Sequence, residues 1–427
     1  MTMKNQMRPG ADKPDLNDPA VIECPYAAYD IYREQAAVHK VAEGRYMVMR
    51  YDDVREGLSN HELFSRDTVG FFDPDRPSRV DIIWKCPEAR RLFAEEGWQS
   101  WPQAAALNTD PPLHTRFRKF VDPMFSMKRV REMTPYIQDL IDDLIDGFID
   151  KGEADFVQEF AVPLPMHVIC DRLGFPKEDL DRLKFWSIEM SKSVSFTMTP
   201  EEEVACARNL VDCQRYMVAQ LEHKRRHPAD DILSEIAQIK PGAESGFEMG
   251  DILSLISSIL IGGNESTTNA LSSGLWLLLR NPDVLAALKE NPDLTRNFVE
   301  ENLRLESPFQ YFLRAVRQET DLHGVTLKKG DLLDVRLGAA NRDPRQYPQP
   351  DKIDLKRPGI TNHLAFGAGV HRCLGNMLAR TELALAFQTL LRRLDNIQLS
   401  PKNTYEHMPH AMFRGLTALY ITFDKAA

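Results

Sequence analysis

The sequence predicts a mainly α-helical protein with small β-sheets, an α+β fold, built as one large domain over residues 1–427. Long segments carry apolar residues at helical spacing, and only a few short segments look extended. No Ser/Gly/Pro-rich linker and no internal repeat divides the chain, although its length alone would suit about three domains. An apolar content of 43% is sufficient for a substantial core.

Composition argues against several classes of protein. A net charge of −10 makes nucleic acid an improbable partner. No uninterrupted apolar run reaches the about 18–20 residues of a membrane-spanning helix, and the polar N-terminus lacks the apolar core of a signal peptide. The six cysteines show no CxxC spacing and no regular disulfide framework. We therefore expect a soluble, cytoplasmic monomer with a flexible tail over residues 1–18 and no membrane contact.

The N-terminal part of the chain is expected to combine short helices with a hairpin. Helical patterns cover 27–35 and 51–59, and the segments 38–42 and 45–49 flank a turn at Gly44. Residues 65–108 have poor periodicity, two glycines and four prolines that break regular structure, and several large aromatic side chains. Such a segment is usually a functional loop, here one that covers a pocket, or else a surface excursion with its own small core. Asp110, followed by two prolines, predicts a capped helix start.

The remainder of the chain is predicted to be helical, with extended segments near its end. The predicted helices are 130–152, 156–173, 177–194, 200–227, 249–279 and 291–305, followed by one from the cysteine loop to Leu394. The extended segments are 309–316, a hairpin of 325–327 with 332–335, and the strands 397–399 and 418–423.

Cys373 lies at the end of a glycine-rich loop, 366–375, just before a helical pattern. The N–H groups and the dipole of a helix N-terminus favour an anion, so a thiolate here could serve as a metal ligand or a nucleophile. Glycines let the backbone take unusual dihedral angles and come close to a flat, bulky partner. A lone cysteine in such a loop is more often simply buried.

The longest helical pattern, 249–279, contains Gly262 and Gly263, followed by Glu265, Ser266 and Thr267. Each glycine in a helix interior costs about 1 kcal/mol relative to alanine. The pair therefore has either a functional reason or a packing reason, since small residues allow helices to approach closely. An acid followed by hydroxyl groups in an apolar surround favours the functional interpretation.

The string F-G-A-G-V-H-R-C-L-G at 366–375 resembles the haem-thiolate loop of the cytochrome P-450 superfamily, soluble bacterial type. Three further motifs match: D-P-P-x-H-x-x-x-R at 110–118, G-G-x-(D/E) at 262–265, and E-x-x-R at 301–304. The resemblance covers nearly the whole chain. It implies the fold of that family, with haem b between the helix 249–279 and the helix after the cysteine loop, and Cys373 as the axial thiolate.

The resemblance also assigns roles to individual residues. Ser266 stands where the family usually has threonine, and Thr267 could replace it if the helix is locally rewound. Glu265, Ser266 and Thr267 are thus the candidate catalytic, proton-delivering residues. The cofactor-binding candidates are Cys373 as metal ligand, His114, Arg118, Arg314 and His371 on the propionates, and Phe366, Gly367 and Gly263. A buried ion network of Glu301, Arg304 and Arg357 is expected to fix the cysteine loop.

The implied activity is that of a monooxygenase, which activates O2 and inserts one oxygen atom into a small apolar substrate by hydroxylation or O-dealkylation. Electrons would come from a separate ferredoxin, or a flavodoxin, with its NAD(P)H-dependent reductase. The candidate docking charges are Arg116, Lys119, Arg372 and Arg380, and the candidate substrate-facing residues are Ile259, Gly262, Phe309, Phe312 and Met412. The alternatives are a peroxide-using haem-thiolate enzyme, a non-catalytic haem ligand sensor, and a helical scaffold without haem.

Overall fold

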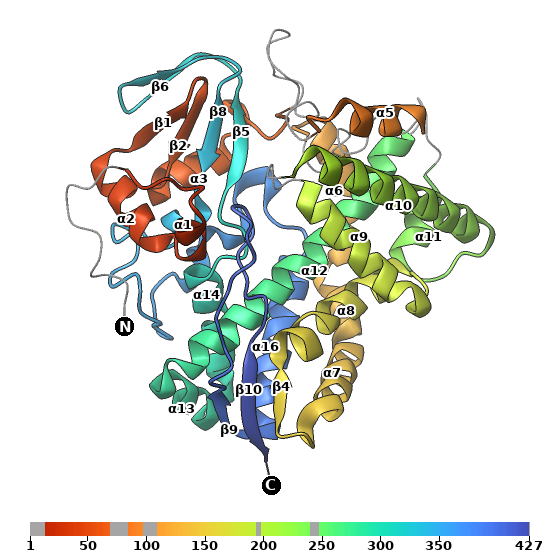
Figure 1. The fold of residues 1–427 in the computed structure, drawn as a ribbon, viewed down its shortest axis with the longest axis vertical. Coiled ribbons are helices and arrows are strands. Elements are labelled where there is room, and N and C mark those ends of the chain that lie inside the picture. Colours follow the sequence, from red (N-terminus) through yellow and green to blue (C-terminus); the bar gives the residue numbers. More distant parts are fainter. Residues whose placement is uncertain (1–12, 69–83, 97–108, 194–197, 240–246, 427) are drawn as a thin grey trace. The chain divides into compact units, whose positions relative to one another are not determined.

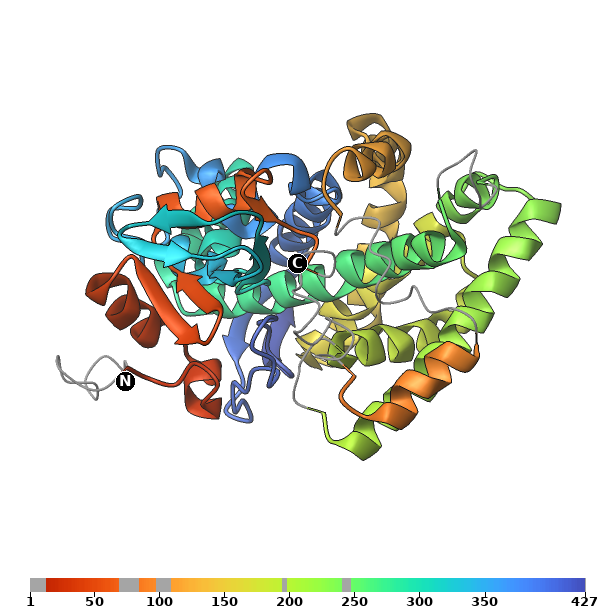
Figure 2. The ribbon, with the colours of Figure 1, turned by 90° about the horizontal axis from the view of Figure 1, so that it is seen from above.

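The computed structural model describes residues 13–68, 84–96, 109–193, 198–239 and 247–426. Its contacts divide the chain into two compact units: unit 1 comprises Met1–Ser65, Glu132–Ala161 and Ser266–Ala427, and unit 2 comprises Arg66–Arg131 and Val162–Glu265. The described residues are mostly helical with short strands, which confirms the predicted fold class. Two of the four boundaries between the units fall within helices, namely α7 (Met127–Ile149) and α12 (Met249–Leu279). The longest described helix, α12, is continuous in both views (Figures 1 and 2).

The main sheet of unit 1 has the strand order β1-β2-β8-β5-β3 (Figure 1). The strands β1 (Val38–Ala42) and β2 (Arg45–Val48) form the predicted antiparallel hairpin. Gly44 turns between them at φ +64°, a left-handed conformation that glycine adopts without strain. The other strands are β3 (Phe64–Ser65), β5 (Phe312–Val316) and β8 (Leu332–Val335).

The predicted hairpin of 325–327 with 332–335 is wrong, because its two strands take other partners. The first, β7 (Val325–Leu327), pairs with β6 (Thr320–Leu322) in a separate two-stranded sheet. The second, β8, lies between β2, to which it is parallel, and β5, to which it is antiparallel. Three of the four residues of β8 are buried, as suits a central strand, and a local turn signal does not reveal such distant partners.

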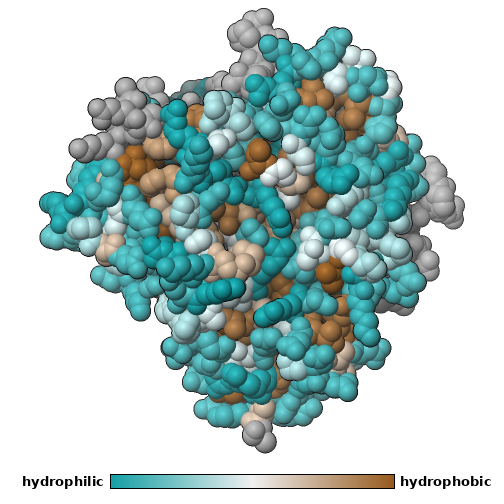
Figure 3. Space-filling model, turned by 180° about the vertical axis from the view of Figure 1, so that it is seen from behind, coloured by the Kyte–Doolittle hydropathy of each residue, from teal (hydrophilic) through white to brown (hydrophobic). Residues whose placement is uncertain are grey.

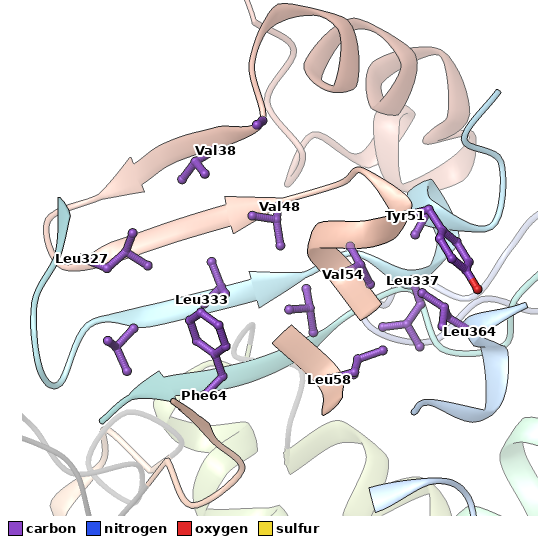
Figure 4. Close-up of a cluster of buried hydrophobic side chains, with 14 of the residues drawn as sticks. Val38, Val48, Tyr51, Val54, Leu58, Phe64, Leu327, Leu333, Leu337 and Leu364 are labelled. Atoms are coloured by element: carbon purple, nitrogen blue, oxygen red, sulfur yellow. The ribbon is translucent and has the colours of Figure 1, made fainter. Parts of the chain in front are cut away.

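An apolar core joins this sheet to α3 (Tyr51–Ser59) (Figure 4). Val48 and Leu333 come from neighbouring strands, and Val54 comes from the buried face of α3. Leu364, which precedes the cysteine loop, belongs to the same cluster. The loop is therefore connected through its apolar leading residue to the core of the sheet.

The remaining elements of unit 1 are helices and a second sheet. The strands β4 (Glu153–Asp155), β10 (Tyr420–Lys425) and β9 (Leu394–Leu399) are antiparallel in that order, so the two predicted C-terminal strands pair with each other. The helices are α1 (Pro19–Glu23), α2 (Tyr26–Gln35), α13 (Pro282–Glu290), α14 (Thr295–Leu305), α15 (Leu337–Ala340) and α16 (Asn376–Arg393).

Unit 2 is helical in its described part: α5 (Pro87–Glu95), α6 (Leu113–Val121), α8 (Pro163–Leu173), α9 (Leu180–Ser193), α10 (Pro200–Arg226) and α11 (Ile232–Ala237). The continuous helix predicted over 156–173 is wrong. A short π-helix, Val157–Ala161, precedes α8. Pro163 has no N–H to continue the first segment, but it is well suited to start the second.

The segment 65–108, predicted to be a covering loop, contains a helix where it is described. Trp84 is fully buried, and its ring centroid lies 4.9 Å from that of Phe93 on α5. The Cys86 N–H donates to Glu203 on α10 at 2.6 Å, and Arg215 of α10 pairs with Glu96. These contacts support the alternative of an excursion with its own small core; the other aromatic residues of the segment lie outside the described residues.

The described surface is largely polar. On the face drawn in Figure 3, hydrophilic residues predominate and hydrophobic residues form small separate groups. Across the part of the chain that the structure describes, no helix combines the length and the apolar character needed to cross a membrane.

Candidate functional site

Cys373 lies in unit 1 on the irregular segment that leads into α16. Its backbone N–H donates to the Phe366 carbonyl at 2.8 Å, and its own carbonyl accepts a hydrogen bond from Asn376 Nδ2 at 2.7 Å. Gly367 and Gly369 both have φ of +67°, so glycine allows the two turns that return the chain to Phe366. These contacts fix the cysteine backbone three residues before the helix begins.

The glycines of the loop have different functions. A Cβ on Gly369 would lie 2.7 Å from Ser59 Cα at the end of α3, so this glycine allows two backbones to pack closely. A Cβ on Gly367 would meet nothing closer than the His371 carbonyl at 3.8 Å, and one on Gly375 would have no described atom within 4 Å. There is thus open space beside Gly367 and Gly375, on either side of Cys373.

Cys373 is exposed, which distinguishes it from the buried cysteines of the chain. Burial raises the pKa of Cys170 to about 12, and it also raises the pKa of Cys206 and Cys213. Those three thiols therefore stay protonated at neutral pH. Cys24 is also exposed, but it ends the short helix α1 and has no glycine loop around it.

A polar cluster that the sequence analysis missed lies beside the loop. Arg380 of α16 donates to both oxygens of Glu300 on α14, at 2.6 and 3.0 Å. Its guanidinium carbon also lies 4.3 Å from the ring centroid of Phe366. His363 Nδ1 accepts the Ala365 N–H at 3.2 Å, so Nε2 carries the proton and donates to Glu300 at 3.0 Å. The residue whose carbonyl holds the Cys373 N–H is thus itself covered by a paired arginine.

The charges of this cluster are fixed by burial and hydrogen bonding. Burial alone would raise the pKa of Glu300, but the hydrogen bonds from His363 and Arg380 lower it to about 2. Burial lowers the pKa of His363, so its imidazole is neutral at pH 7. The charge of Arg380, one of the expected docking residues, is paired with Glu300.

The three residues expected to form an ion network do come together. Arg304 donates to both oxygens of Glu301, at 2.6 and 2.9 Å, and Arg357 Nε donates to Oε1 at 3.1 Å. Both arginines also donate to the Lys352 carbonyl, at 3.0 and 2.9 Å, and the Asp354 N–H donates to Glu301. Because Glu301 and Arg304 have no exposed surface, the loss of one partner would leave an uncompensated buried charge.

The two glycines of α12 have different surroundings. A Cβ on Gly263 would lie 2.7 Å from Ile169 Cγ1 on α8, so this position serves close helix packing. A Cβ on Gly262 would have no described atom within 4 Å. Ser266 lies one turn after Gly262 on the same face, whereas Thr267 lies one turn after Gly263. The open face of the helix is therefore the one that carries Gly262 and Ser266. The Ser266 side chain is half-buried, whereas Thr267 is buried.

Glu265 is held within unit 2 by side chains of α9. Its Oε1 accepts from Lys184 Nζ at 2.8 Å and from Ser187 Oγ at 3.1 Å. The Asn264 amide donates to Ser187 Oγ at 3.0 Å and to the same Glu265 oxygen at 3.3 Å. Glu265 is only 4% exposed, and Lys184 is its charge partner. No pattern in the sequence indicates this lysine.

Of the four residues expected to bind the haem propionates, two lie in each unit. In unit 2, His114 and Arg118 are four apart on α6, where His114 is buried and Arg118 donates to Asp122 at 2.6 Å. In unit 1, Arg314 is buried in β5 and His371 ends the short 3-10 helix Gly369–His371.

The aspartate cap that the sequence predicted for α6 is wrong. Pro112 occupies the N-cap position of α6, and no side chain caps the helix. The Asp110 carboxylate instead accepts the Arg66 N–H at 3.1 Å.

Three of the substrate-facing candidates come together in unit 1. The ring centroid of Phe309 lies 5.1 Å from that of Phe312, and the Gln310 N–H donates to the Met412 carbonyl at 2.8 Å. Ile259 and Gly262 lie on the part of α12 that belongs to unit 2. The charges of Arg116, Lys119 and Arg372 are exposed.

Comparison with known proteins identifies the family. The family model of cytochrome P450 matches residues 201–417. Cytochrome P450 CYP107DY1 of Priestia megaterium is 32% identical over 378 residues, which cover 88% of this chain and 89% of that protein. The chain belongs to the cytochrome P450 family. Vitamin D(3) 25-hydroxylase of Pseudonocardia autotrophica is 31% identical over 420 residues, 97% of each chain. The crystal structure of CalO2 has a TM-score of 0.84 at 28% identity and covers 98% of this chain and 100% of its own.

Membership of the cytochrome P450 family makes the protein a monooxygenase that binds haem b through a cysteine thiolate. The residues present fit that cofactor. The accessible thiol of Cys373 lies between two glycines that have open space beside them. The other cysteines do not lie in a glycine-rich loop, and each is buried, half-buried or at a helix end. The cytochrome P450 fold is that of the similar solved structures.

Proposed function

We propose that this cytochrome P450 hydroxylates a small apolar organic molecule and that Cys373 is the haem ligand. The observation that carries the proposal is the exposed thiol of Cys373, whose backbone is held by the Phe366 carbonyl in a glycine loop. Similarity to a protein named as a hydroxylase supports this reaction type. When bound, the haem supplies the activation of O2, of which one atom enters a substrate C–H bond and the other leaves as water, with two electrons and two protons consumed.

The residues of the chain position the ligand and deliver protons. Glu301, Arg304 and Arg357 hold the segment before the loop, and Glu300 with Arg380 holds Phe366. On α12, Glu265 accepts its described hydrogen bonds at Oε1, so Oε2 is the oxygen that exchanges a proton with water. Ser266, on the face of Gly262, is the hydroxyl that passes the proton on, in place of Thr267.

Electrons are supplied by a separate ferredoxin, or a flavodoxin, with its reductase, and Arg116, Lys119 and Arg372 contribute to the docking surface. His114, Arg118, Arg314 and His371 bind the propionates. An acid and a hydroxyl at Glu265 and Ser266 favour an enzyme that uses O2 over one that uses peroxide, because O2 activation needs protons delivered to it. A purely ligand-sensing protein would have no such need either.

A spectrum of the purified protein tests the assignment of Cys373. After reduction and addition of carbon monoxide, the wild type should show the strongly red-shifted Soret band of thiolate ligation. Cys373→Ser should lose that band, and Cys24→Ser, a change at another exposed cysteine, should keep it. A band that persists in Cys373→Ser would overturn the proposal. Turnover with a surrogate ferredoxin system, compared with turnover with hydrogen peroxide, separates the oxygenase from its two alternatives.

A further inference from the structure

Unit 1 contains a small pocket that the proposed function does not use. Its polar lining consists of Tyr29 from α2, Gln310 before β5, Arg336 after β8, and His410 and Arg414 of the C-terminal tip. Apolar side chains complete the wall. The described lining residues include no carboxylate, so the polar groups that face the pocket are mainly hydrogen-bond donors and two guanidinium groups.

Arg336 is the unusual member of this lining. The residue is 7% exposed, and its Nε is buried without a hydrogen-bond partner among the described residues. Its guanidinium carbon lies 4.3 Å from the ring centroid of Tyr311, and its Nη2 reaches Asp334 at 3.3 Å. Buried donors are nearly always hydrogen-bonded in native proteins, so an N–H of this kind indicates a missing acceptor.

The charges around Arg336 are unbalanced. Asp334 accepts two shorter hydrogen bonds from Arg45, at 3.0 and 2.8 Å, which leaves Arg336 the weaker share of that carboxylate. Two guanidinium groups thus share one carboxylate, and one positive charge is in excess. By contrast, Arg414 is satisfied, because it donates to Glu306 at 2.9 Å and to the carbonyls of Ile22 and Glu23.

The other polar groups suit an anion. His410 Nδ1 accepts the N–H groups of Met412 and Phe413, at 3.1 and 3.2 Å, so the hydrogen of its ring lies on Nε2. The Tyr29 hydroxyl donates to Gln310 at 3.2 Å, so its proton is already used and the charge of Arg336 remains the main attraction for an anion. A monoanion matches the single excess charge of Arg336, whereas a dianion such as phosphate would bring one uncompensated charge into a buried site.

A row of aromatic rings leads away from the pocket. His410 and Phe413, both in the lining, have ring centroids 4.9 Å apart. Phe413 lies 4.7 Å from Phe309, which lies 5.1 Å from Phe312. The last two residues are the proposed substrate contacts in unit 1. A cationic pocket therefore adjoins an apolar aromatic surface.

We propose that this pocket binds the carboxylate of an apolar carboxylic acid, with Arg336 as its charge partner and the aromatic row beside its hydrocarbon part. The inference rests on the proposed function, because it names the class of substrate that the oxygenase accepts. A guanidinium group and a carboxylate form a charge-assisted hydrogen bond, and the buried Nε of Arg336 gains its acceptor.

Calorimetric titration of the holoenzyme with a matched pair of ligands, octanoate and 1-octanol, tests this inference at neutral pH. The wild type should bind octanoate at least ten-fold more tightly than 1-octanol, a difference of about 1.4 kcal/mol. Arg336→Gln should abolish this preference without weakening the binding of 1-octanol. Arg336→Lys, which keeps the charge, should retain part of it. Arg45→Gln leaves the Asp334 carboxylate to Arg336 alone, which removes the excess charge without changing a lining residue, so it should reduce the preference. Arg55→Gln is the matched control, because Arg55 pairs with Asp52 and does not line the pocket, and it should keep the preference.

Three outcomes would overturn the inference: equal affinity of the wild type for the acid and the alcohol, an unchanged preference in Arg336→Gln, or loss of the preference in Arg55→Gln. A third ligand, acetate, separates a head-group site from a site for free small anions, and acetate binding as tight as that of octanoate would also overturn it. The proposed function fails separately, through the absence of the thiolate Soret band, and calorimetry does not depend on that band.

Discussion

Alanine substitutions at the two adjacent glycines of α12 should have opposite effects. Gly262→Ala places a methyl group in open space, and Gly263→Ala places one 2.7 Å from Ile169 Cγ1 and 2.8 Å from its Cδ1. We expect Gly262→Ala to stabilise the protein and to impair carbon monoxide binding and turnover. We expect Gly263→Ala to destabilise it and to impair ligand binding less, because that methyl group points at α8.

The magnitudes follow from helix propensity and packing. Alanine in place of glycine in a helix interior contributes about 1 kcal/mol, and at Gly262 nothing opposes this gain. Overpacking a core costs about 1–3 kcal/mol, because contacts below 3 Å force the neighbours to move. At Gly263 this cost offsets or exceeds the same gain, so the stabilities of the two variants should differ by about 1–3 kcal/mol.

Urea unfolding followed by far-UV circular dichroism measures the stabilities of both variants, provided that the transition is cooperative. Ile169→Ala removes the two nearest of the three atoms that a Cβ at Gly263 would meet, so a double-mutant cycle of these two changes should show a favourable coupling of about 1 kcal/mol. Two results would refute the reasoning: Gly263→Ala as stable as Gly262→Ala, or additive effects in the cycle. Carbon monoxide affinity equal in the two glycine variants would refute the functional half.

Three further predictions concern other parts of the site. Ser266→Thr should raise the ratio of product formed to NAD(P)H consumed and lower peroxide release, because the added methyl group restricts the hydroxyl rotamer; unchanged coupling would count against Ser266 as the relay. Glu300→Gln should lower the free energy of unfolding by about 2–3 kcal/mol at pH 7, because the fold lowers the pKa of this carboxyl from 4.5 to about 2. The ionised carboxylate contributes this stability above pH 4.5 and loses it as the pH falls toward 2. The difference in unfolding free energy between wild type and variant should therefore be smaller at pH 3 than at pH 7. Arg372→Glu should slow reduction by an acidic ferredoxin and make the rate less sensitive to salt, and stopped-flow rates identical to those of the wild type would exclude this docking position.

The sequence revealed local features well and distant partners poorly. The spacing of Glu301 and Arg304 is sufficient to place them on one helix face, because three residues make nearly one turn. The partner strands of β8 are not deducible in this way, because they depend on how segments far apart in the chain meet in the sheet. The same limit explains Gly262 and Gly263, which look equivalent until Ile169 of another helix is seen beside one of them.

Some functional groups were missed because their residue types are common. Glu300 looks like an ordinary helix-surface acid, and Lys184 looks like one of many exposed lysines on an amphipathic helix. Their roles become visible only through partners from other elements, Arg380 and His363 for the first and Glu265 for the second. The one local hint was the pair of adjacent acids in α14, since two neighbouring carboxylates on a helix cannot face the same side.

The geometry of α14 explains why the position of Cys373 does not depend on the loop alone. Glu300 and Glu301 are consecutive, so they point about 100° apart around a rigid helix. Glu301 binds Arg304 and Arg357 and accepts the Asp354 N–H, which fixes the chain before the loop. Glu300 binds His363 just before the loop and Arg380 in the first turns of α16 after it. The segment that carries the thiol is therefore attached at both ends to one helical turn. The glycines between these attachments would allow many backbone conformations in isolation, but the attachments hold the segment in one position.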